Sequence, residues 1–596
     1  MSSTGFNVDT RDLHFVLFEQ LKIHETLAGY EKFEDWDREM YESLIDAATE
    51  LCVDKLAPVN AEGDRVGCTL DPNGDVTIPA CYEEPWNAMR EGGWIGVSAP
   101  MEYGGVGLPL PIAAMASELM NGSNPALYMY GGLTKGAAGL IEACGNDWAK
   151  DTCCEKLFSG QWAGTMCLTE AHAGTDVGSA RTKASPNDDG SYNIKGQKIF
   201  ISCADHQFVE NVIHLVLARL PDAAEGSKGI SIFIVPKFNF DDNSRNGVFV
   251  EGIEHKMGIN GSATCSLSFG ARSECKGYLV GEAGEGLKIM FHMMNEARIG
   301  VGIQGVGAAA AALGNAISYA KEREQGGAGS KRVPIIQHPD VRRMLLSMKS
   351  KTEAMRSLTY TLSLHHDISE LEDDQFLASK HHGYVEMLTP ICKSYCTDVG
   401  YDVATMGVQV YGGFGYIKEY PMEQHIRDVK IASIYEGTNG VQALDLLGRK
   451  LTHKNGMYFM QWLDFTNQEI ERAKEVGCFE TEIAAIEKTR GAVGACAMHL
   501  GQTAMTGNRK GAILQATPFL NMFGNVVLAI HSLTQATVAQ EALNRGDCSE
   551  SDKHFYKGKV ANLKWYVFNE LPQAVALSKS ILSGDETALE PGLFGE

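Results

Sequence analysis

Hydrophobic positions along the chain follow two different periods. Over most of the sequence they recur every three to four residues, the spacing of one buried face of an α-helix. From Trp162 to about residue 280 they recur every second residue, and β-branched and aromatic residues become frequent. The clearest such runs are residues 191–202, 211–220, 229–236 and 264–269. Joined by Gly, Asn and Asp turns, they predict a small antiparallel β-domain or barrel.

Helical periodicity organises the rest of the chain. Residues 6–160 predict an all-α region, and a further long helix is expected at 555–582. Three long helical segments follow the strands and predict a bundle, at 286–324, 338–367 and 383–413. The expected fold class is mainly α with a central β-domain. The length favours three or four units. The patterns indicate four, at 1–163, 164–280, 281–450 and an extra C-terminal helical unit at 451–596.

The net charge of the chain argues against two classes of binding partner. Its 596 residues carry 52 Lys and Arg against 75 Asp and Glu, a formal net charge of −23. Nucleic acids and anionic membranes both require positive surface, so neither is an expected partner. No stretch reaches eighteen uninterrupted apolar residues, so no membrane span is expected.

The cysteines and the first residues predict a compartment. The fifteen cysteines are scattered and match neither a disulfide nor a zinc framework. The start of the chain lacks the basic region and the apolar region of a secretory signal. We therefore expect reduced, mostly buried thiols in a cytoplasmic protein.

Two histidine pairs, at 365–366 and 381–382, invite a metal-site interpretation. Metal-binding histidines on a helix stand four residues apart, whereas each of these pairs is adjacent. The acidic residues between the pairs, within 370–374, predict a solvated loop. No metal is expected.

One acidic residue, Glu436, stands between an apolar run and a Gly-Thr-Asn-Gly turn within residues 428–449. Gly437 lets the backbone approach a ligand closely, and the apolar spacing downstream predicts a helix with one buried face. Two interpretations are open from these residues. Glu436 is either a favourable charge at a helix N-terminus or a rigidly held catalytic base.

A second stretch suited to chemistry is Met166 to Gly178, MCLTEAHAGTDVG, at the entry to the strand region. Backbone amides in its small-residue turn, with the hydroxyls of Thr169 and Thr175, suit a diphosphate or the polar edge of a flavin. No G-x-G-x-x-G follows a strand and opens a helix, and the glycines of residues 411–416 do not fit that context. A Rossmann dinucleotide site is therefore not predicted.

The order of these motifs resembles one family. After an α-region come LTEAHAGTDVG at 168–178, KGQKIFIS at 195–202, long helices, and VYGGFGYIKEYPMEQHIRDVKIASIYEGTNGVQ at 410–442. This is similar to the acyl-CoA dehydrogenase family over about residues 40–450. The resemblance implies a helical domain, a β-domain and a second helical domain that bind FAD and an acyl-CoA thioester.

Cofactor residues follow from the resemblance, motif by motif. On the flavin side it implies contacts from Met166, Leu168, Thr169, Phe200 and Ser202, with Gly174 and Thr175 near the diphosphate or the CoA arm. The family often has Trp and Thr where this chain has Phe200 and Ser202. Thr438 falls at a further cofactor contact.

The resemblance also implies an oligomer, because part of the FAD site is completed by a neighbouring subunit. Arg323 matches an arginine that reaches the FAD diphosphate of that neighbour, and Gln409, Gly412 and Gly413 match adenosine contacts across the same interface. A homodimer or homotetramer is expected. The loop after Arg323, GGAGSKRVPIIQ, departs from the shorter family loop. From the residues alone, Arg323 is an exposed helix charge.

The implied chemistry removes the α-proton of the thioester while the β-carbon gives hydride to the flavin. Glu436 matches the family base in the Tyr-Glu-Gly-Thr motif. The implied substrate-side residues are Thr175, Arg298, Tyr435 and Gly437. Some relatives carry the base immediately before the arginine matched by Arg298, where this chain has Ala297. Glu296 is about 100° away around a helix and is a poor substitute.

The outer parts of the chain, before about residue 40 and after 450, resemble a larger subgroup of the family. The implied product is a trans-2-enoyl-CoA, from a fatty acyl-CoA or from 3-methylmercaptopropionyl-CoA, with electrons passing to an electron-transfer flavoprotein. Two alternatives are an oxidase that uses oxygen and a non-catalytic, nucleic-acid-binding relative. The second requires a basic C-terminal domain, and residues 451–596 show no basic run.

Overall fold

The computed structural model describes residues 5–327 and 331–595, without the side chains of 291–293. The chain divides into two compact units. Unit 1 comprises Met1–Asp46, Pro109–Glu118 and Arg298–Glu596, and unit 2 comprises Ala47–Leu108 and Leu119–Ala297. Three helices contribute residues to both units: α3 (Arg38–Leu51), α6 (Leu110–Ser123) and α9 (Gly286–Glu322). The expected fold class, mainly α with a central sheet, is confirmed.

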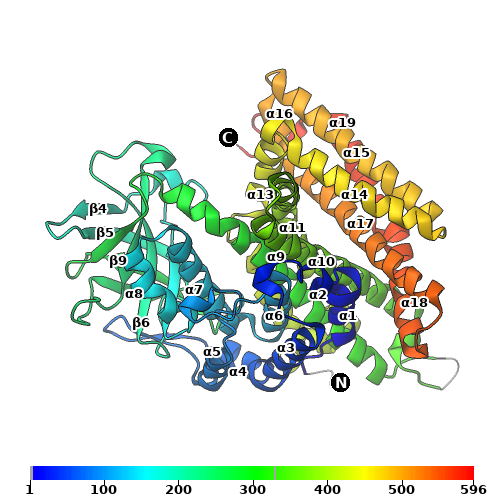
Figure 1. The fold of residues 1–596 in the computed structure, drawn as a ribbon, viewed down its shortest axis with the longest axis horizontal. Coiled ribbons are helices and arrows are strands. Elements are labelled where there is room, and N and C mark those ends of the chain that lie inside the picture. Colours follow the sequence, from blue (N-terminus) through cyan, green and yellow to red (C-terminus); the bar gives the residue numbers. More distant parts are fainter. Residues whose placement is uncertain (1–4, 328–330, 596) are drawn as a thin grey trace. The chain divides into compact units, whose positions relative to one another are not determined.

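Unit 2 is built around a sheet that closes on itself (Figure 1). Along the sheet the strands follow the order β10-β7-β6-β4-β5-β9-β8, and β10 also pairs with β5, which makes the sheet a barrel. The strands are β3 (Trp162–Cys167), β4 (Lys183–Pro186), β5 (Tyr192–Ser202), β6 (Asn211–Arg219), β7 (Ile230–Pro236), β8 (Val248–Ile253), β9 (Thr264–Phe269) and β10 (Lys276–Val280).

The expectation of an antiparallel β-domain is wrong at two pairs, β3 with β6 and β4 with β6. Strands β3 and β6 run parallel, in register from Trp162 opposite Asn211 to Cys167 opposite Val216. A parallel pair needs a long crossover connection. The hairpin of β4 and β5 lies within that connection, so the chain between β3 and β6 is long enough to reverse direction twice.

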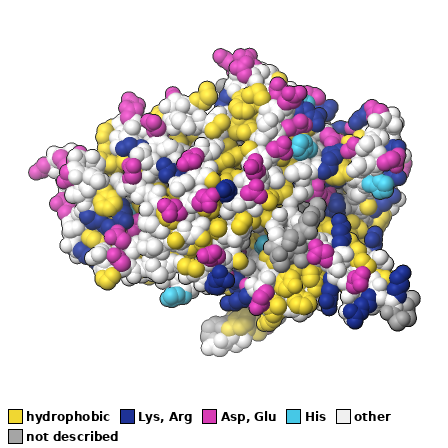
Figure 2. All heavy atoms as spheres, turned by 90° about the horizontal axis from the view of Figure 1, so that it is seen from below, with side chains coloured by type: hydrophobic (Ala, Val, Ile, Leu, Met, Phe, Trp, Pro, Cys, Tyr) yellow, Lys and Arg dark blue, Asp and Glu magenta, His cyan; other side chains and the backbone are white. Residues whose placement is uncertain are grey.

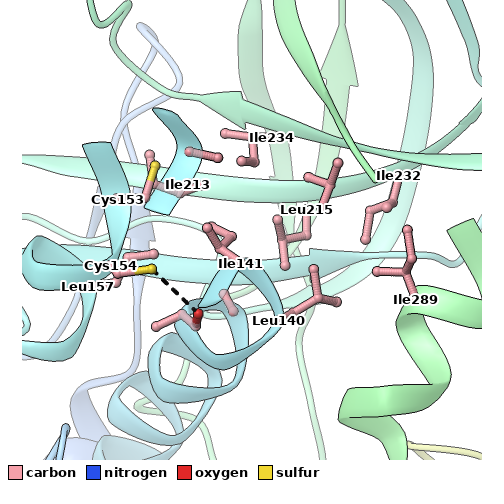
Figure 3. Close-up of a cluster of buried hydrophobic side chains, with 14 of the residues drawn as sticks. Leu140, Ile141, Cys153, Cys154, Leu157, Ile213, Leu215, Ile232, Ile234 and Ile289 are labelled. Carbon is pink, nitrogen blue, oxygen red and sulfur yellow. Dashed lines mark hydrogen bonds between the residues drawn. The ribbon is translucent and has the colours of Figure 1, made fainter. Parts of the chain in front are cut away.

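Helices α7 (Pro125–Cys144) and α8 (Asp147–Phe158) pack on β3, and their apolar side chains share one buried cluster with those of β6 and β7 (Figure 3). Strand β6 is buried along almost its whole length because both of its faces are covered. Ile213 and Leu215 point to the helices, with Leu140 and Ile141 of α7 against them. The smaller elements of unit 2 are α4 (Ala57–Val66), β1 (Thr69–Leu70), β2 (Val76–Thr77) and α5 (Glu83–Glu91).

Unit 1 is a helical bundle centred on α10 (Pro339–Leu371) and α11 (Gln375–Tyr411), which pack along each other. Helix α17 (Ala516–Arg545) packs on both of them, and α14 (Met457–Val476) packs on α11 and α17. The three long helices expected after the strands are therefore found as α9, α10 and α11. The remaining helices of the unit are α1 (Thr10–His14), α2 (Ile23–Thr26), α12 (Met422–Lys430), α13 (Asn439–Asp445), α15 (Glu480–Met505), α16 (Arg509–Leu514), α18 (Glu550–Trp565) and α19 (Pro572–Ser583).

The single helix expected at 555–582 is interrupted. Helix α18 ends at Trp565, a π-helical turn covers Tyr566–Glu570, and α19 begins at Pro572. Proline has no N–H to donate and fits the first turn of a helix, so Pro572 starts a new helix instead of continuing the old one. Apolar periodicity alone does not predict this break between the two helices.

A buried ionic cluster joins four parts of unit 1. Arg356 of α10 donates from Nε to both carboxylate oxygens of Glu118, at 2.9 and 3.0 Å, and from Nη1 to Asp12. Lys559 of α18 also donates to Asp12, and it reaches Glu353 Oε2 at 2.6 Å. Every member is buried. The segment at the N-terminus is thus fixed to the C-terminal helices.

Among the described residues, two helices are long and apolar enough to cross a membrane by length and composition, α9 and α17. The apolar window is 78% buried inside the protein in α9 and 94% buried in α17. Such burial is typical of a core helix, which passes the same test.

Acidic and basic side chains lie interspersed on the face drawn in Figure 2. The net charge of the chain is −23, so acidic groups outnumber basic ones. A polyanion approaching this face would meet carboxylates among the basic groups.

Candidate active site

The proposed base, Glu436, stands on a strained turn of unit 1. Its φ is 54° and that of Gly437 is 82°, so two consecutive residues are left-handed. This conformation is costly for a residue with a side chain, and such strain is concentrated at functional sites. A φ of 82° is one that L side chains rarely adopt, and a Cβ at position 437 would also lie 2.7 Å from Gln442 Nε2, so a side chain there would be strained. The turn therefore holds the Glu436 backbone in one geometry.

Helix α13 and helix α11 fix this turn from the C-terminal side. Thr438 is the N-cap of α13, and its Oγ1 accepts a hydrogen bond from the Val441 amide at 3.2 Å. Asn439 donates from Nδ2 to the Ser394 carbonyl at 3.1 Å and to Asp398 Oδ1 at 2.8 Å. The first residue of α13 is thus clamped onto α11. The sequence predicted the helix but contained no signal for this clamp.

Opposing influences set the protonation of Glu436. Burial raises the pKa of its carboxyl, and the positive charges of Lys393 and Arg298 oppose that rise. The Glu436 side chain is partly buried. The carboxylate therefore combines two properties of a general base, a raised pKa and nearby charges that allow it to ionise.

Arg298 and Tyr435, both expected on the substrate side, lie near the turn. Arg298 is buried, and its Nη1 forms an ion pair with Asp445 Oδ2 at 3.2 Å. Its Nη2 would be 3.9 Å from a Cβ at Gly437. The Tyr435 hydroxyl donates to Gln304 Oε1. Among the described residues, Arg298 Nε is a buried donor without an acceptor, and such a donor can serve a ligand.

The alternative base position holds no carboxylate. Ala297 precedes Arg298, and the neighbouring Glu296 is half-exposed. Glu296 forms an ion pair with Lys135 at 2.9 Å.

In unit 2, the end of β3 presents the expected flavin-edge residues Met166, Leu168 and Thr169, all partly buried. Strand β5 holds them from one side. The Ile199 amide donates to the Thr169 carbonyl at 2.9 Å, and Lys198 Nζ donates to the Leu168 carbonyl at 2.9 Å. Because these contacts involve backbone carbonyls, they fix the path of the chain through the motif.

Phe200 and Ser202 follow on the same strand. The register of β5 against β9 shifts between Lys198 and Ile201, and Phe200 there has a φ of 57° and is 60% exposed. A bulge of this kind re-aims a side chain. Within residues 5–327, the hydroxyls of Thr169, Thr175 and Ser202 have no hydrogen-bond partner. An exposed aromatic ring with free hydroxyls fits the apolar face and polar edge of a flavin.

A buried ion pair that the sequence did not point to supports this edge. Lys198 Nζ lies 2.8 Å from Glu170 Oε1, and the Arg181 amide donates to Glu170 Oε2 at 2.7 Å. Burial raises the pKa of Glu170, but these donors and the Lys198 charge outweigh it and lower the pKa to about 2. Glu170 and Lys198 lie within the two recognised motifs, so their motif membership was the available signal.

Gly174 and Thr175 are exposed in the loop after Glu170. A tight turn opens this loop, in which the Ala173 amide donates to the Glu170 carbonyl at 2.9 Å. A Cβ at Gly174 would meet no atom within 4 Å. The position is therefore open enough for a ligand.

The residues expected at a subunit interface gather in a second patch of unit 1. Arg323 lies 5.6 Å from the centre of the Phe414 ring, next to the turn of Gly412 and Gly413. Gln409 is exposed on the last turn of α11, and its carbonyl accepts from the Gly412 amide. Arg323 makes no ion pair with the described part of the chain.

The histidine pairs lie in the bundle of unit 1. His365 and His381 face each other with 3.0 Å between their Nδ1 atoms, against Phe465 and Tyr384. Burial lowers the pKa of both rings. Over the described ranges, no three His, Cys, Asp or Glu residues are grouped as a metal site would require. Residues 372–374 are a linker, and α11 begins at Gln375, so His381 and His382 are helical.

Four family domains match the chain. They are the N-terminal domain of acyl-CoA dehydrogenases over residues 38–161, the middle domain over 165–271, the C-terminal domain over 284–451, and an acetyl-CoA dehydrogenase C-terminal-like domain over 462–591.

Two full-length relatives have described activities. The chain is 35% identical to 3-methylmercaptopropionyl-CoA dehydrogenase of Ruegeria pomeroyi, over 99% of this chain and 100% of that protein. It is 34% identical to a butyryl-CoA dehydrogenase of Syntrophomonas wolfei, over 99% of each.

Two solved structures share the fold. One is an acyl-CoA dehydrogenase of Bacillus anthracis complexed with FAD, with a TM-score of 0.73, 22% identity, and coverage of 93% of this chain and 90% of that one. The other is butyryl-CoA dehydrogenase of Megasphaera elsdenii, with a TM-score of 0.57, 29% identity, and coverage of 70% and 100%.

Proposed function

This chain belongs to the acyl-CoA dehydrogenase family, and we propose that Glu436 is the base with which it removes the α-proton of its substrate. The enzyme is FAD-dependent and converts an acyl-CoA thioester to the trans-2-enoyl-CoA. The strained turn carries the assignment of Glu436: burial there raises the pKa of its carboxyl, and the positive charges of Lys393 and Arg298 oppose that rise.

The α-proton passes to the Glu436 carboxylate, and the charge that develops on the thioester oxygen needs donors. The Glu436 amide has no acceptor within the described part of the chain. We assign this N–H to the thioester oxygen. Arg298 Nε, buried without an acceptor, is proposed to orient the substrate together with Tyr435, Gly437 and Thr175. FAD, when bound, supplies the acceptor for the hydride from the β-carbon.

The residues proposed to hold FAD fall into two sets. In unit 2 they are Met166, Leu168, Thr169, Gly174, Thr175, Phe200 and Ser202, and in unit 1 Thr438 is proposed to add a contact. The free hydroxyls and the exposed Phe200 ring support this assignment.

Replacing Glu170 by Gln is expected to weaken FAD binding. The ammonium of Lys198, which holds the Leu168 carbonyl, would remain buried without its carboxylate, at a cost of about 3 kcal/mol in unfolding free energy. In the wild type this stabilisation is present above pH 4.5 and is lost as the pH falls toward 2. Thermal melting and FAD retention after dialysis measure both effects.

The control for this variant is Glu251→Gln on β8. Glu251 pairs with Arg272 at 2.7 Å, but both side chains are more than one third exposed, so little change is expected. If Glu170→Gln retains FAD and melts like the wild type, the ion pair of Glu170 and Lys198 has no role in cofactor binding.

We also propose that the enzyme is a homodimer or homotetramer in which one subunit completes the FAD site of another. The patch of Arg323, Gln409, Gly412 and Gly413 supports this, since it is exposed in the isolated chain and Arg323 is not neutralised there.

Arg323→Ala is expected to lower FAD affinity by about tenfold to a hundredfold, the range for a lost charge-assisted hydrogen bond. Titration of the apoenzyme with FAD, with light scattering for the mass, measures this. Arg332→Ala, another exposed arginine of the same loop region, is the control. An unchanged affinity in Arg323→Ala would contradict the proposed contact.

The acyl chain and the electron acceptor are also proposals. A short fatty acyl-CoA or 3-methylmercaptopropionyl-CoA is the proposed substrate, and an electron-transfer flavoprotein the proposed acceptor. The full-length similarity to dehydrogenases of these two substrate types supports the choice. We place the enzyme in the cytoplasm, a reducing compartment, in keeping with fifteen unpaired cysteines.

Anaerobic flavin reduction tests the function directly. The yellow protein is mixed with short, medium, long and methylthio acyl-CoAs, and loss of the flavin absorbance is followed. Bleaching by at least one of them is expected. No bleaching by any member would contradict the proposed substrate class, and rapid reoxidation by air would favour an oxidase.

A further inference from the structure

A buried lysine, Lys393 of α11, lies beside the turn that carries Glu436. Its side chain is fully buried, and its Nζ donates to Asn439 Oδ1 at 2.9 Å. Asn439 follows Thr438 and is the residue that clamps the turn onto α11. Lys393 therefore supports the turn through the side chain of Asn439.

The partner of this lysine is unusual within the protein. Three other fully buried lysines, Lys198, Lys450 and Lys559, each have a carboxylate within ion-pair distance. Over the described residues Lys393 has none, and its hydrogen-bond acceptor is a neutral amide. A buried charge without a counter-charge is costly. Burial accordingly lowers the pKa of Lys393 to about 8.

The charges around Lys393 and Glu436 come from helices α9, α11, α12 and α13 and from the π-helical turn Leu446–Lys450. Lys393 interacts with Glu436, with Asp398 of its own helix and with Arg298 of α9, and Glu436 interacts with Lys393 and Arg298. Around them, Asp398 interacts with Lys430 and Asp402, and Arg298 interacts with Asp445, Arg449 and Glu386. Arg298 is paired with Asp445, so its charge is partly compensated. The charge of Lys393 is not compensated in this way.

We propose that Lys393 is a positioning residue of the dehydrogenation, which holds the turn through Asn439 and places an uncompensated positive charge beside the Glu436 carboxylate. The proposal rests on the assignment of Glu436 as the base. Burial raises the pKa of that carboxyl and so disfavours the ionised form, which is the form that accepts the α-proton. The lysine charge opposes this rise and favours the ionised form, without touching substrate.

The test is the pH profile of flavin reduction. The FAD-loaded enzyme is mixed anaerobically with butyryl-CoA between about pH 5 and about pH 9, and the rate of bleaching is measured. In Lys393→Met and Lys393→Gln, the acid limb should move to higher pH. At a pH on that limb, the rate relative to each variant's own plateau should fall by about tenfold. Lys393→Arg keeps the charge and should keep the wild-type limb.

Two features make this test independent of folding. Lys393→Gln retains an amide donor for Asn439, so it carries the test if Lys393→Met does not fold. Lys450→Met is the matched control, because Lys450 is equally buried but pairs with Glu386. It should lower stability and leave the acid limb in place. The KM for butyryl-CoA should not change in the Lys393 variants.

The outcomes separate the two proposals. If the folded, FAD-loaded Lys393→Gln variant keeps the wild-type acid limb while Glu436→Gln is inactive, Lys393 has no such role and Glu436 is still the base. If Glu436→Gln is active, the assignment of the base is wrong and the proposal for Lys393 fails with it.

Discussion

Glu436→Gln is expected to keep FAD and to lose its reduction by acyl-CoA. The amide has the shape of the carboxylate but cannot accept a proton, so the rate of flavin reduction should fall by about 10²–10⁴-fold, the usual contribution of a general base. Anaerobic stopped-flow measurement of the flavin absorbance gives this rate. The FAD content should stay at one per chain, because Glu436 is not among the residues proposed to hold the cofactor.

Glu296→Gln is the matched control for this variant. Glu296 is the acidic residue nearest the alternative base position, and it is half-exposed and paired with Lys135. The flavin of the Glu296→Gln variant should be reduced by acyl-CoA at nearly the wild-type rate. Loss of activity in Glu296→Gln with a normal rate in Glu436→Gln would reverse the assignment of the base.

Stability provides a second measurement on Glu436→Gln. Burial raises the pKa of Glu436 above its ordinary 4.5, so the folded state favours the protonated form. This favourable contribution is complete below pH 4.5 and is lost as the pH rises through the folded-state pKa. The glutamine variant carries no such charge. Its free energy of unfolding, compared with the wild type, should therefore increase with pH above 4.5.

Lys559→Met is expected to destabilise unit 1 strongly. The substitution removes the ammonium shared by Asp12 and Glu353 and leaves both buried carboxylates short of a partner. Breaking a buried ion pair from one side costs about 3–5 kcal/mol. Denaturant unfolding followed by circular dichroism measures the loss. Lys553→Met is the control on the same helix, since Lys553 pairs with the exposed Glu550 and little change is expected.

The same ionic cluster predicts that the stability of unit 1 decreases at acidic pH. Burial raises the pKa of Asp12, but the charges of Lys559 and Arg356 outweigh burial and hold it well below its ordinary 3.8. The stabilisation is therefore present above pH 3.8 and is lost as the pH falls below it. Lys559→Met should show less of this acid sensitivity. An equal loss of stability on acidification in both proteins would contradict the role of the pair.

The fold could be predicted from the sequence as far as local periodicity extends. The helices α9, α10 and α11 and the strands β5, β6, β7 and β9 lie where their apolar patterns place them. The parallel pairing of β3 with β6 could not be predicted, because an apolar run does not specify its neighbour. The break before α19 could have been predicted from the sequence, because Pro572 is a residue that ends one helix and begins another.

Some residues of the candidate site could likewise be predicted from the sequence, and others could not. Glu436, Arg298 and Tyr435 could be named because they lie in or near recognisable motifs. Lys393 and Asn439 are 46 residues apart, and their contact depends on how α13 meets α11. Lys198 with Glu170, and Arg356 with Asp12, are likewise pairs formed by tertiary packing. A sequence shows that each of these residues is charged but not which partner neutralises it.

The ionic cluster of unit 1 also determines when that unit can be completed during synthesis. Asp12 and Lys559 are separated by 547 residues along the chain. A ribosome adding roughly 5–20 residues per second needs on the order of a minute to make that length. Unit 2 ends at Ala297 and is fully made well before then. During the interval the apolar residues next to Asp12, Leu13 and Phe15 to Leu17, lack the C-terminal helices that later cover them. The segment around Asp12 is made long before α18 and is therefore among the last to find its native contacts, so it needs protection from aggregation until α18 emerges.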